Sequence, residues 1–228
     1  MSKFYFLIIL LILVLISCKK EEKKTSFTKQ NNSTVKIIKA EKKPVNKDSL
    51  NNKNAVAYFT EYGKQNKETQ VIFITRHGDI TIKLYKNTPL HRASFIFLTK
   101  IGYFSTTCFH RVVNGFIAQG GNSENRETVN IRNKYKHYTL PPEFRKNRKH
   151  KRGALAIARD WEDNPKKLST PFEFYFIQSK GEHHLNNEHT VFGEVIKGMH
   201  VIDRIVKEDV DVDEWPFTDV LIEAKVIK

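Results

Sequence analysis

The sequence predicts a mainly β protein in which a closed antiparallel β-barrel is capped by two helices. Short runs of alternating apolar and polar residues recur between residues 70 and 227, and turn-forming residues separate them. Two long stretches show the apolar spacing of an amphipathic helix, at 88–101 and 198–207. Several antiparallel strands with only two main helices, one near each end, predict a closed β-barrel capped at both ends. Residues 54–228 provide enough chain for one hydrophobic core.

Residues 1–17 are predicted to be a lipoprotein signal peptide. Lys3 supplies a positive start, and an unbroken apolar run follows from residue 4 to residue 16. As a helix this run would be about 20 Å long, which is too short for the roughly 30 Å hydrocarbon core of a bilayer. It ends in Leu15-Ile16-Ser17-Cys18, which resembles a bacterial lipobox, so Cys18 is expected to be acylated and to become the mature N-terminus. The alternative is an ordinary signal peptide with an incidental cysteine.

Residues 18–53 are predicted to be a flexible tether, because they are rich in Lys, Asn, Ser, Thr and Glu and contain few large apolar side chains. The stretch Lys19-Lys20-Glu21-Glu22 resembles the export signal of surface lipoproteins in the Bacteroidetes. A solvated charge run is the alternative. We therefore expect a membrane-anchored lipoprotein on the periplasmic or cell-surface side, with the outer membrane favoured.

The first half of the domain is predicted to be a helix, two strands and a second helix. A short helix begins with Asn54 as N-cap and ends at Gly63. The longer helix opens with Thr88 as N-cap and Pro89 at its first position, and it stops at Gly102. The two alternating strands between the helices are placed at 70–75 and 79–85.

The second half is predicted to consist of strands with long connections and the helix at 198–207. Residues 122–137 are polar and expected to have little order, and residues 145–152 are strongly basic. Because this basic stretch lacks interleaved aromatic residues for base stacking, we expect a solvated loop and no nucleic-acid partner. The remaining strands are placed at 154–159, 172–178, 190–195 and 220–227.

The most informative stretch is 109–121, which predicts a β-hairpin with its turn at Asn114-Gly115. Alternation places Phe109 and Arg111 on one strand face and His110 on the other. A guanidinium, an aromatic ring and an amide on rigid strands could form a small pocket for a peptide segment. The simpler interpretation is a hairpin with a core phenylalanine and a solvated arginine.

This stretch resembles the signature of the cyclophilin-type peptidyl-prolyl cis-trans isomerases. The matching residues are Phe109, His110, Arg111, Phe116, Gln119, Gly120 and Gly121. The resemblance covers roughly residues 55–228. It implies a cyclophilin-like barrel, no cofactor, and acceleration of X-Pro isomerisation in proline-containing polypeptides, which would aid the folding of exported proteins. A monomer is expected.

The resemblance also implies roles for individual residues. Arg111 would be the catalytic residue, and Gln119 would hold the substrate backbone and position Arg111. The wall of the proline pocket, with a histidine on its rim, would consist of Phe116, Ile117, Tyr175, Leu185 and His189. Further substrate-binding positions along the peptide groove would be Ala158, Arg159 and Glu173. The structural alternatives are barrel core for the apolar members and a surface histidine for His189.

A guanidinium suits this reaction. Rotation about an X-Pro amide faces a barrier of about 18–20 kcal/mol, and no covalent bond is broken. The twisted nitrogen becomes a hydrogen-bond acceptor only as its resonance is lost, so a donor aimed at it binds the transition state better than the ground state. One charged hydrogen bond contributes roughly 1.5–3 kcal/mol, or about one to two decades of rate. Grip on the proline and desolvation of the amide must supply the rest.

Three residues depart from the usual cyclophilin pattern. Glu173 stands where the family usually has a glutamine, and an ionised carboxylate cannot donate to a substrate carbonyl. Glu173 is expected to pair with Arg111 or Arg159. Such a pair would either orient the catalytic arginine or take up the donors that it needs for the substrate. Arg159 itself stands where an asparagine that bonds the peptide backbone is common. His184 replaces a tryptophan that many members use for cyclosporin, so weak binding of that drug is expected.

These departures keep a second function open, a cyclophilin-like binding module that holds proline-containing segments with little or no turnover. A surface adhesin built on the barrel is a third interpretation. No metal is expected, because His183, His184 and His189 lack the Cys or carboxylate arrangement that would complete a site. No disulfide is expected either, because lipidation of Cys18 leaves Cys108 without a partner.

Overall fold

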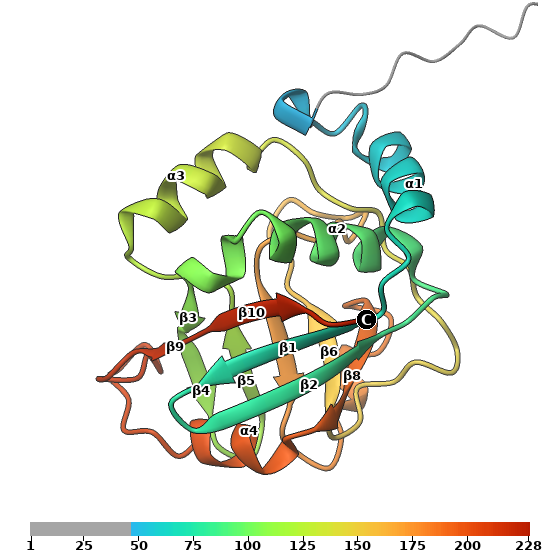
Figure 1. Ribbon diagram of the computed structural model, residues 1–228. Helices are drawn as coiled ribbons and strands as arrows, with labels where there is room; N and C mark the ends of the chain where they lie inside the picture. Colours follow the sequence, from blue (N-terminus) through green and yellow to red (C-terminus); the bar gives the residue numbers. More distant parts are fainter. Residues whose placement is uncertain (1–46) are drawn as a thin grey trace, which may run out of the picture. The chain divides into compact units, whose positions relative to one another are not determined.

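The computed structural model describes residues 47–228, which are dominated by one curled antiparallel sheet (Figure 1). The strands are β1 (Gln70–Thr75), β2 (Gly78–Leu84), β3 (Cys108–Phe109), β4 (Arg111–Val113), β5 (Ile117–Gly120), β6 (Ala154–Ile157), β7 (Phe174–Ile177), β8 (Val191–Lys197), β9 (Val220–Leu221) and β10 (Glu223–Val226). The helices are α1 (Ala55–Gln65), α2 (Pro89–Lys100), α3 (Arg126–Tyr135) and α4 (Met199–Ile205), with 3₁₀ turns η1 (Lys47–Ser49), η2 (Tyr103–Thr106) and η3 (His183–Leu185). The predicted signal peptide, Cys18 and most of the predicted tether lie outside the described residues. Within residues 47–228, no helix is both long and apolar enough to cross a bilayer.

Eight strands pair in the order β10-β1-β2-β8-β6-β7-β5-β4, and β3 pairs with β9 in a separate small sheet. The prediction of a closed barrel is wrong in this respect, because the ladder of the eight strands does not join its two edge strands in the described part of the chain. A single residue interrupts the strand at each edge of the sheet: His110 separates β3 from β4, and Ile222 separates β9 from β10. The predicted closing strand 220–227 is therefore two short strands.

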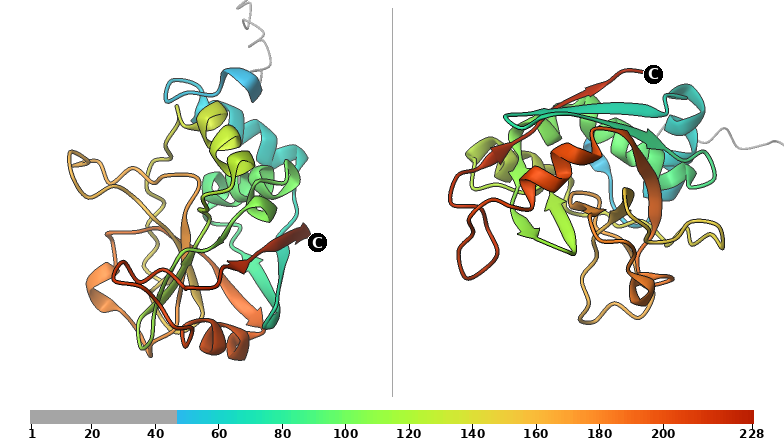
Figure 2. Two further views of the ribbon diagram at one scale, coloured as in Figure 1. Left: turned by 90° about the vertical axis from the view of Figure 1, so that its left-hand side faces the viewer. Right: turned by 90° about the horizontal axis from the view of Figure 1, so that it is seen from below.

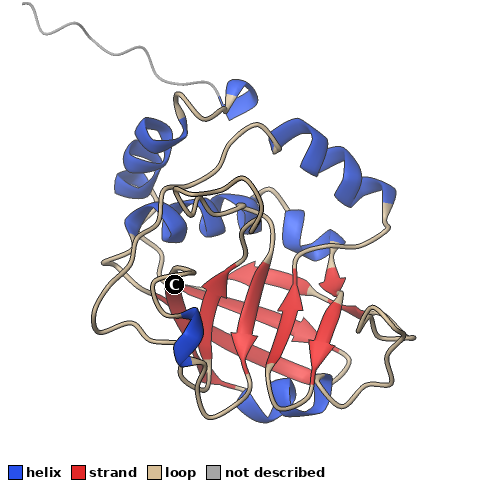
Figure 3. Cartoon of the chain, turned by 180° about the vertical axis from the view of Figure 1, so that it is seen from behind, coloured by secondary structure: helices blue, strands red, loops and turns tan. Residues whose placement is uncertain are grey.

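The described residues contain four α-helices where the sequence predicted two main ones and one short one. α2 lies over one end of the curled sheet, and α4 lies at the opposite end (Figures 1 and 3). α1 and α3 form a further layer on α2 (Figure 2). The ring of Phe97 on α2 makes both contacts, with its centroid 5.8 Å from that of Phe59 on α1 and 5.4 Å from that of Tyr135 on α3.

Two boundaries near the start of the domain differ from the prediction. α1 continues through Gly63, because this glycine permits close approach to α2: a Cβ here would lie 3.2 Å from the Ala93 Cβ. Arg92 reinforces the contact by donating from Nη2 to the Gly63 carbonyl oxygen at 2.9 Å. The predicted tether is too long at its C-terminal end, since Leu50 already belongs to the hydrophobic core.

α2 begins at its predicted proline, but its first turn is capped from a distant part of the chain. Thr88 makes no side-chain cap. Instead, the buried carboxylate of Glu143 accepts from the backbone N–H groups of Leu90 and His91 at 3.3 and 3.0 Å. The Glu143 backbone N–H donates in turn to Thr190 Oγ1 at 3.0 Å. This buried carboxylate thereby ties the end helix to the segment that enters β8.

Residues 122–137 include α3, although the sequence predicted little order there. Asn125 caps the helix by accepting from the Glu127 backbone N–H at 2.8 Å. Only Thr128 and Tyr135 of this helix are buried. With so few apolar side chains on one face, the sequence shows too weak a helical period to predict α3. The helix is stabilised by the packing of Tyr135 against Phe97 of α2 more than by its intrinsic propensity.

The strands β5 to β7 carry apolar side chains on both faces of the sheet. On the inner face, Phe174 and Phe176 of β7 belong to the main hydrophobic core. On the outer face, Tyr175 and Ile177 join Ile117 of β5 in a second, smaller cluster. Because successive residues of a strand point to opposite faces, one strand contributes to the core and to an outward-facing apolar surface.

Candidate functional site

A pocket of about 500 Å³ lies on the outer face of the sheet, over β5 and β7. All ten side chains that the sequence analysis assigned to the site line this pocket. Lining residues that were not assigned to the site are Arg132, Asp160, Trp161, Thr170 and His184. Segments far apart in the sequence, including α3 and η3, therefore meet at one cavity.

The hairpin β4–β5 places Arg111 directly opposite Gln119. Its turn lies at the predicted Asn-Gly pair. Gly115 has a φ of +81°, a left-handed conformation that glycine adopts without strain. The backbone N–H of Phe116 closes the turn by donating to the Val113 carbonyl oxygen at 3.0 Å.

The strand is interrupted at His110, just before this hairpin. Phe109 belongs to β3, and its ring packs in the core with centroids 6.1 Å from that of Phe174 and 6.2 Å from that of Phe176. Arg111 belongs to β4 and lines the pocket. The prediction that Phe109 and Arg111 share a strand face is therefore wrong, since a break in a strand resets the alternation.

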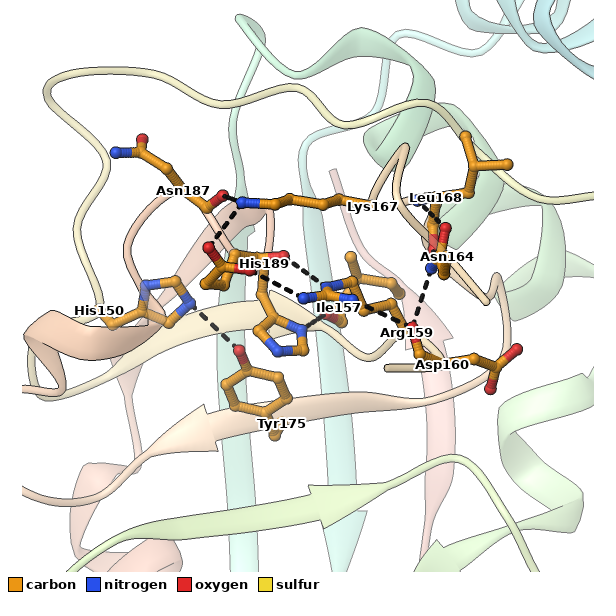
Figure 4. Close-up of polar contacts among 11 residues, drawn as sticks. His150, Ile157, Arg159, Asp160, Asn164, Lys167, Leu168, Tyr175, Asn187 and His189 are labelled. Atoms are coloured by element: carbon orange, nitrogen blue, oxygen red, sulfur yellow. Dashed lines mark hydrogen bonds and ion pairs between the residues drawn. The ribbon is translucent and has the colours of Figure 1, made fainter. Parts of the chain in front are cut away.

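The apolar wall of the pocket consists of Phe116, Ile117, Tyr175 and Leu185. The Tyr175 hydroxyl lies 3.1 Å from His150 Nε2 (Figure 4). On the other side of the same ring, His150 Nδ1 lies 3.1 Å from Asn186 Oδ1. An amide oxygen only accepts, so Nδ1 carries the proton and Nε2 accepts from the Tyr175 hydroxyl. The hydroxyl is thus satisfied inside the protein while the Tyr175 ring lines the pocket.

His150 belongs to the stretch 145–152, which was predicted to be a solvated basic loop. It is only 2% exposed, and burial lowers its pKa to about 4. In the same stretch, the guanidinium of Arg148 lies over the ring of Tyr85, 3.4 Å from the centroid. The prediction of a solvated loop is wrong at these positions, because their side chains are packed against the sheet beside the pocket.

His189 lies at the rim of the pocket as a buried, neutral ring. Its Nδ1 lies 3.1 Å from the Ile157 carbonyl oxygen, which can only accept, so this nitrogen carries the proton (Figure 4). Burial lowers the pKa of His189 to about 4. Its ring contacts those of Trp161 and Tyr175, with centroids 5.2 and 5.5 Å away. His189 is therefore part of an aromatic wall, and the surface alternative is wrong.

Arg159 borders the groove with its guanidinium already engaged. Nε and Nη2 donate to the carbonyl oxygen and to Oε2 of Glu188, both at 2.8 Å. The guanidinium carbon lies 4.0 Å from the centroid of the Trp161 ring. Lys167 holds the second oxygen of the same carboxylate at 2.6 Å (Figure 4). Arg159 thus supports the exposed Trp161 beside the pocket.

Glu173 pairs with neither of the arginines predicted for it. Its Oε1 lies 2.9 Å from Arg132 Nη1, and its Oε2 accepts from Gln119 Nε2 at 3.2 Å. Burial alone would raise the pKa of Glu173, but the hydrogen bond and charge of His110 and the charge of Arg132 outweigh it and lower the pKa to about 2. Glu173 is therefore ionised, and its charge is compensated from α3.

Arg111 is held by the loop between α4 and β9. Its Nε lies 2.6 Å from Glu214 Oε2, and the Glu214 carbonyl oxygen accepts from the Val112 backbone N–H at 2.9 Å. Glu214 has a φ of +65°, which is uncommon for a residue with a Cβ. Gln119, predicted to position Arg111, instead donates to Glu173. The Arg111 side chain is still 35% exposed and lines the pocket, so its guanidinium is accessible from the groove.

Sequence reasoning could have found Trp161, because an aromatic residue two positions after a site residue on the same loop is a usable signal. It had no such signal for Arg132 or Glu214. Both lie in polar stretches and reach the site only through the packing of α3 and of the loop after α4.

A family model described as Cyclophilin type peptidyl-prolyl cis-trans isomerase/CLD matches residues 70–226. The chain belongs to this family. Peptidyl-prolyl cis-trans isomerase B of Escherichia coli K12 is 33% identical over 143 residues, which cover 59% of this cyclophilin and 82% of that protein. Peptidyl-prolyl cis-trans isomerase-like 2 of Rhizopus delemar is 30% identical over 167 residues, which cover 71% of this chain and 29% of that protein.

This cyclophilin also resembles solved structures. A crystal structure of a Cryptosporidium parvum cyclophilin-type isomerase, determined in the presence of the dipeptide Ala-Pro, matches with a TM-score of 0.59 and 23% identity. The match covers 70% of this chain and 99% of that one. The predicted cyclophilin fold is thereby confirmed, with a curled sheet in place of a closed ladder.

Replacing Glu214 with glutamine is expected to slow isomerisation about tenfold while peptide affinity changes little. Without the carboxylate, Arg111 samples more rotamers and must be ordered in each turnover, which costs roughly 1–2 kcal/mol. NMR exchange spectroscopy on a proline peptide measures both quantities in one sample. Asp213→Asn, one residue away and exposed, is the matched control. Equal rates in E214Q and wild type would show that Glu214 does not position Arg111.

Acidification from pH 6.5 towards pH 4 is expected to lower the free energy of unfolding. In the unfolded chain His150 and His189 take up protons near pH 6.5, whereas in the fold their pKa values are about 4. The unfolded state then binds more protons in this window, so stability present above pH 6.5 is lost as the pH falls. The loss is on the order of 3 kcal/mol per histidine. Urea unfolding at several pH values should show a shallower dependence in His189→Gln than in wild type, while exposed His200→Gln should match wild type.

Proposed function

We propose that this cyclophilin accelerates the cis-trans isomerisation of X-Pro bonds in exported polypeptides and so aids their folding. The observation that carries the proposal is the state of Arg111. Arg111 lines the same pocket as the apolar wall, its Nε is paired with Glu214, and its side chain is still 35% exposed.

The pocket would bind the proline ring through shape and apolar contact. Phe116, Ile117, Tyr175 and Leu185 present aromatic and aliphatic carbon, and the polar atoms of Tyr175 are satisfied elsewhere. Proline has no N–H to satisfy, so it loses little on leaving water. A ring fixed in this pocket leaves the acyl side of the X-Pro bond free to rotate.

Arg111 would act on the prolyl nitrogen. As the amide twists, its nitrogen gains a lone pair that can accept from Nη1 or Nη2 of Arg111, and this bond is absent in the planar ground state. The bond forms beside an apolar wall, where charged hydrogen bonds are stronger than in water. No proton is transferred and no covalent intermediate is needed.

The binding-module alternative rests on Glu173, which replaces the usual amide. An unpaired Glu173 carboxylate in the groove would compete with the prolyl nitrogen for the donors of Arg111. The pairing of Glu173 with Arg132 removes that objection, because Arg132 and not Arg111 compensates the charge of this carboxylate. Turnover is therefore the favoured function.

Arg111→Ala is expected to lower kcat/KM by one to two decades, because the transition state loses one charged hydrogen bond. Isomerisation of an X-Pro test peptide by the full chain measures this, with the exposed Arg126→Ala on α3 as the matched control. If wild type and the variant were both folded and both no faster than the uncatalysed reaction, the binding module would take the place of the enzyme.

We also propose that the protein is a lipoprotein held at a membrane through Cys18, on the periplasmic or cell-surface side, and that it works as a monomer. The support is sequence alone: an apolar run of signal-peptide length, the Leu-Ile-Ser-Cys ending and the polar stretch that follows. The same sequence carries the more specific proposal of a Bacteroidetes-type surface lipoprotein.

Labelled palmitate is expected to be incorporated into the wild-type chain and lost in Cys18→Ala. Cys108→Ala is the matched control, since it removes the chain's second cysteine, which is buried and whose pKa burial raises to about 12. Globomycin should block maturation of wild type. Label retained in C18A would contradict the anchor.

A further inference from the structure

We propose that Arg132 binds the substrate peptide, donating to a main-chain carbonyl oxygen in place of the amide that Glu173 has replaced. The inference rests on the proposed function, since it concerns the same groove. It makes the pair of Glu173 and Arg132 a two-residue substitute for one glutamine, in which one side chain holds and the other donates.

The first observation is that the groove contains a carboxylate that cannot serve as a donor. Glu173 lines the pocket and accepts from Gln119 and Arg132. Its ionised oxygens have only lone pairs to offer, as does a peptide carbonyl. Glu173 alone would therefore repel the substrate backbone at this position.

The second observation is the way Arg132 is held. Its Nη1 donates to Asn122 Oδ1 at 2.8 Å and to Glu173 Oε1 at 2.9 Å, and its guanidinium lies 5.2 Å from the centroid of the Phe172 ring. Contacts on several sides fix the guanidinium plane before any substrate arrives.

The third observation is that this fixed guanidinium is still accessible. The Arg132 side chain is 30% exposed and lines the pocket beside Gln119. A guanidinium carries five N–H donors, and Asn122 and Glu173 use two of them, both on Nη1. An ordered, accessible and charged donor on the wall of a peptide groove suits a carbonyl oxygen, and it forms a stronger bond than a neutral amide does.

The competing explanation is that Arg132 only neutralises Glu173. Two double variants of the full chain separate the explanations. Arg132→Leu with Glu173→Leu removes both charges and leaves no donor at either position. Arg132→Leu with Glu173→Gln also removes both charges but places an amide donor at position 173.

The dissociation constant of a neutral X-Pro tetrapeptide and its exchange rate at saturation are measured by NMR for each variant. Arg132→Leu is expected to weaken binding tenfold or more with a smaller change in the saturated rate. R132L/E173L should remain as weak, and R132L/E173Q should regain most of the affinity. The exposed Arg126→Leu on the same helix is the matched control. Thermal unfolding of each variant confirms that it is folded.

Equal recovery in both double variants would overturn the inference in favour of charge neutralisation. A second tetrapeptide, with glutamate before the X-Pro pair, tests whether the acceptor is a carboxylate and not a main-chain carbonyl. If R132L loses affinity for this peptide alone, Arg132 binds the glutamate side chain, and the inference is overturned. Failure of the proposed function would appear separately, as a wild-type protein that binds the peptides without accelerating their isomerisation.

Discussion

The packing of one ring, that of Phe174, fixes the face on which the site can form. Inside the curled sheet it contacts the rings of Phe73, Phe95, Phe104, Phe109 and Phe176. Gly120 leaves it room, because a Cβ there would lie 2.9 Å from the Phe174 ring. With Phe174 held inside, the two-residue period of a strand forces Glu173 and Tyr175 outward into the pocket. A shift of one residue in the register of β7 would move its core side chains to the outer face and its pocket side chains into the core.

Charge compensation is the second organising feature of the pocket. The protein is strongly basic, with a formal net charge of +14, and yet every arginine of the pocket has a carboxylate partner. The pairs are Arg111 with Glu214, Arg132 with Glu173, and Arg159 with Glu188. Because each carboxylate comes from a different segment, the three arginines are fixed independently. A neutral proline segment can then enter without leaving an unpaired charge in a desolvated groove.

Much of the fold could be predicted because it follows local rules. The hairpin at Asn114-Gly115, the proline start of α2 and the aromatic run of β7 can each be recognised in a short stretch of sequence. The same rules could not predict α3, whose stability comes from packing on α2, nor the break at His110. The ten side chains assigned from the family resemblance all line one pocket. The carboxylate partners of the three pocket arginines could not be predicted, because an ion pair between distant segments leaves no pattern in the sequence of either segment.

The position of the aromatic side chains gives the molecule two built-in optical probes. The chain has only two tryptophans. Trp161 is 61% exposed at the pocket, between Arg159 and His189, whereas Trp215 packs on His110 in the loop that holds Arg111. A peptide in the groove would alter the emission of the first, and movement of the loop would alter that of the second. Occupancy of the groove and movement of the loop that holds Arg111 would therefore be reported by different tryptophans of the natural sequence, with no label added.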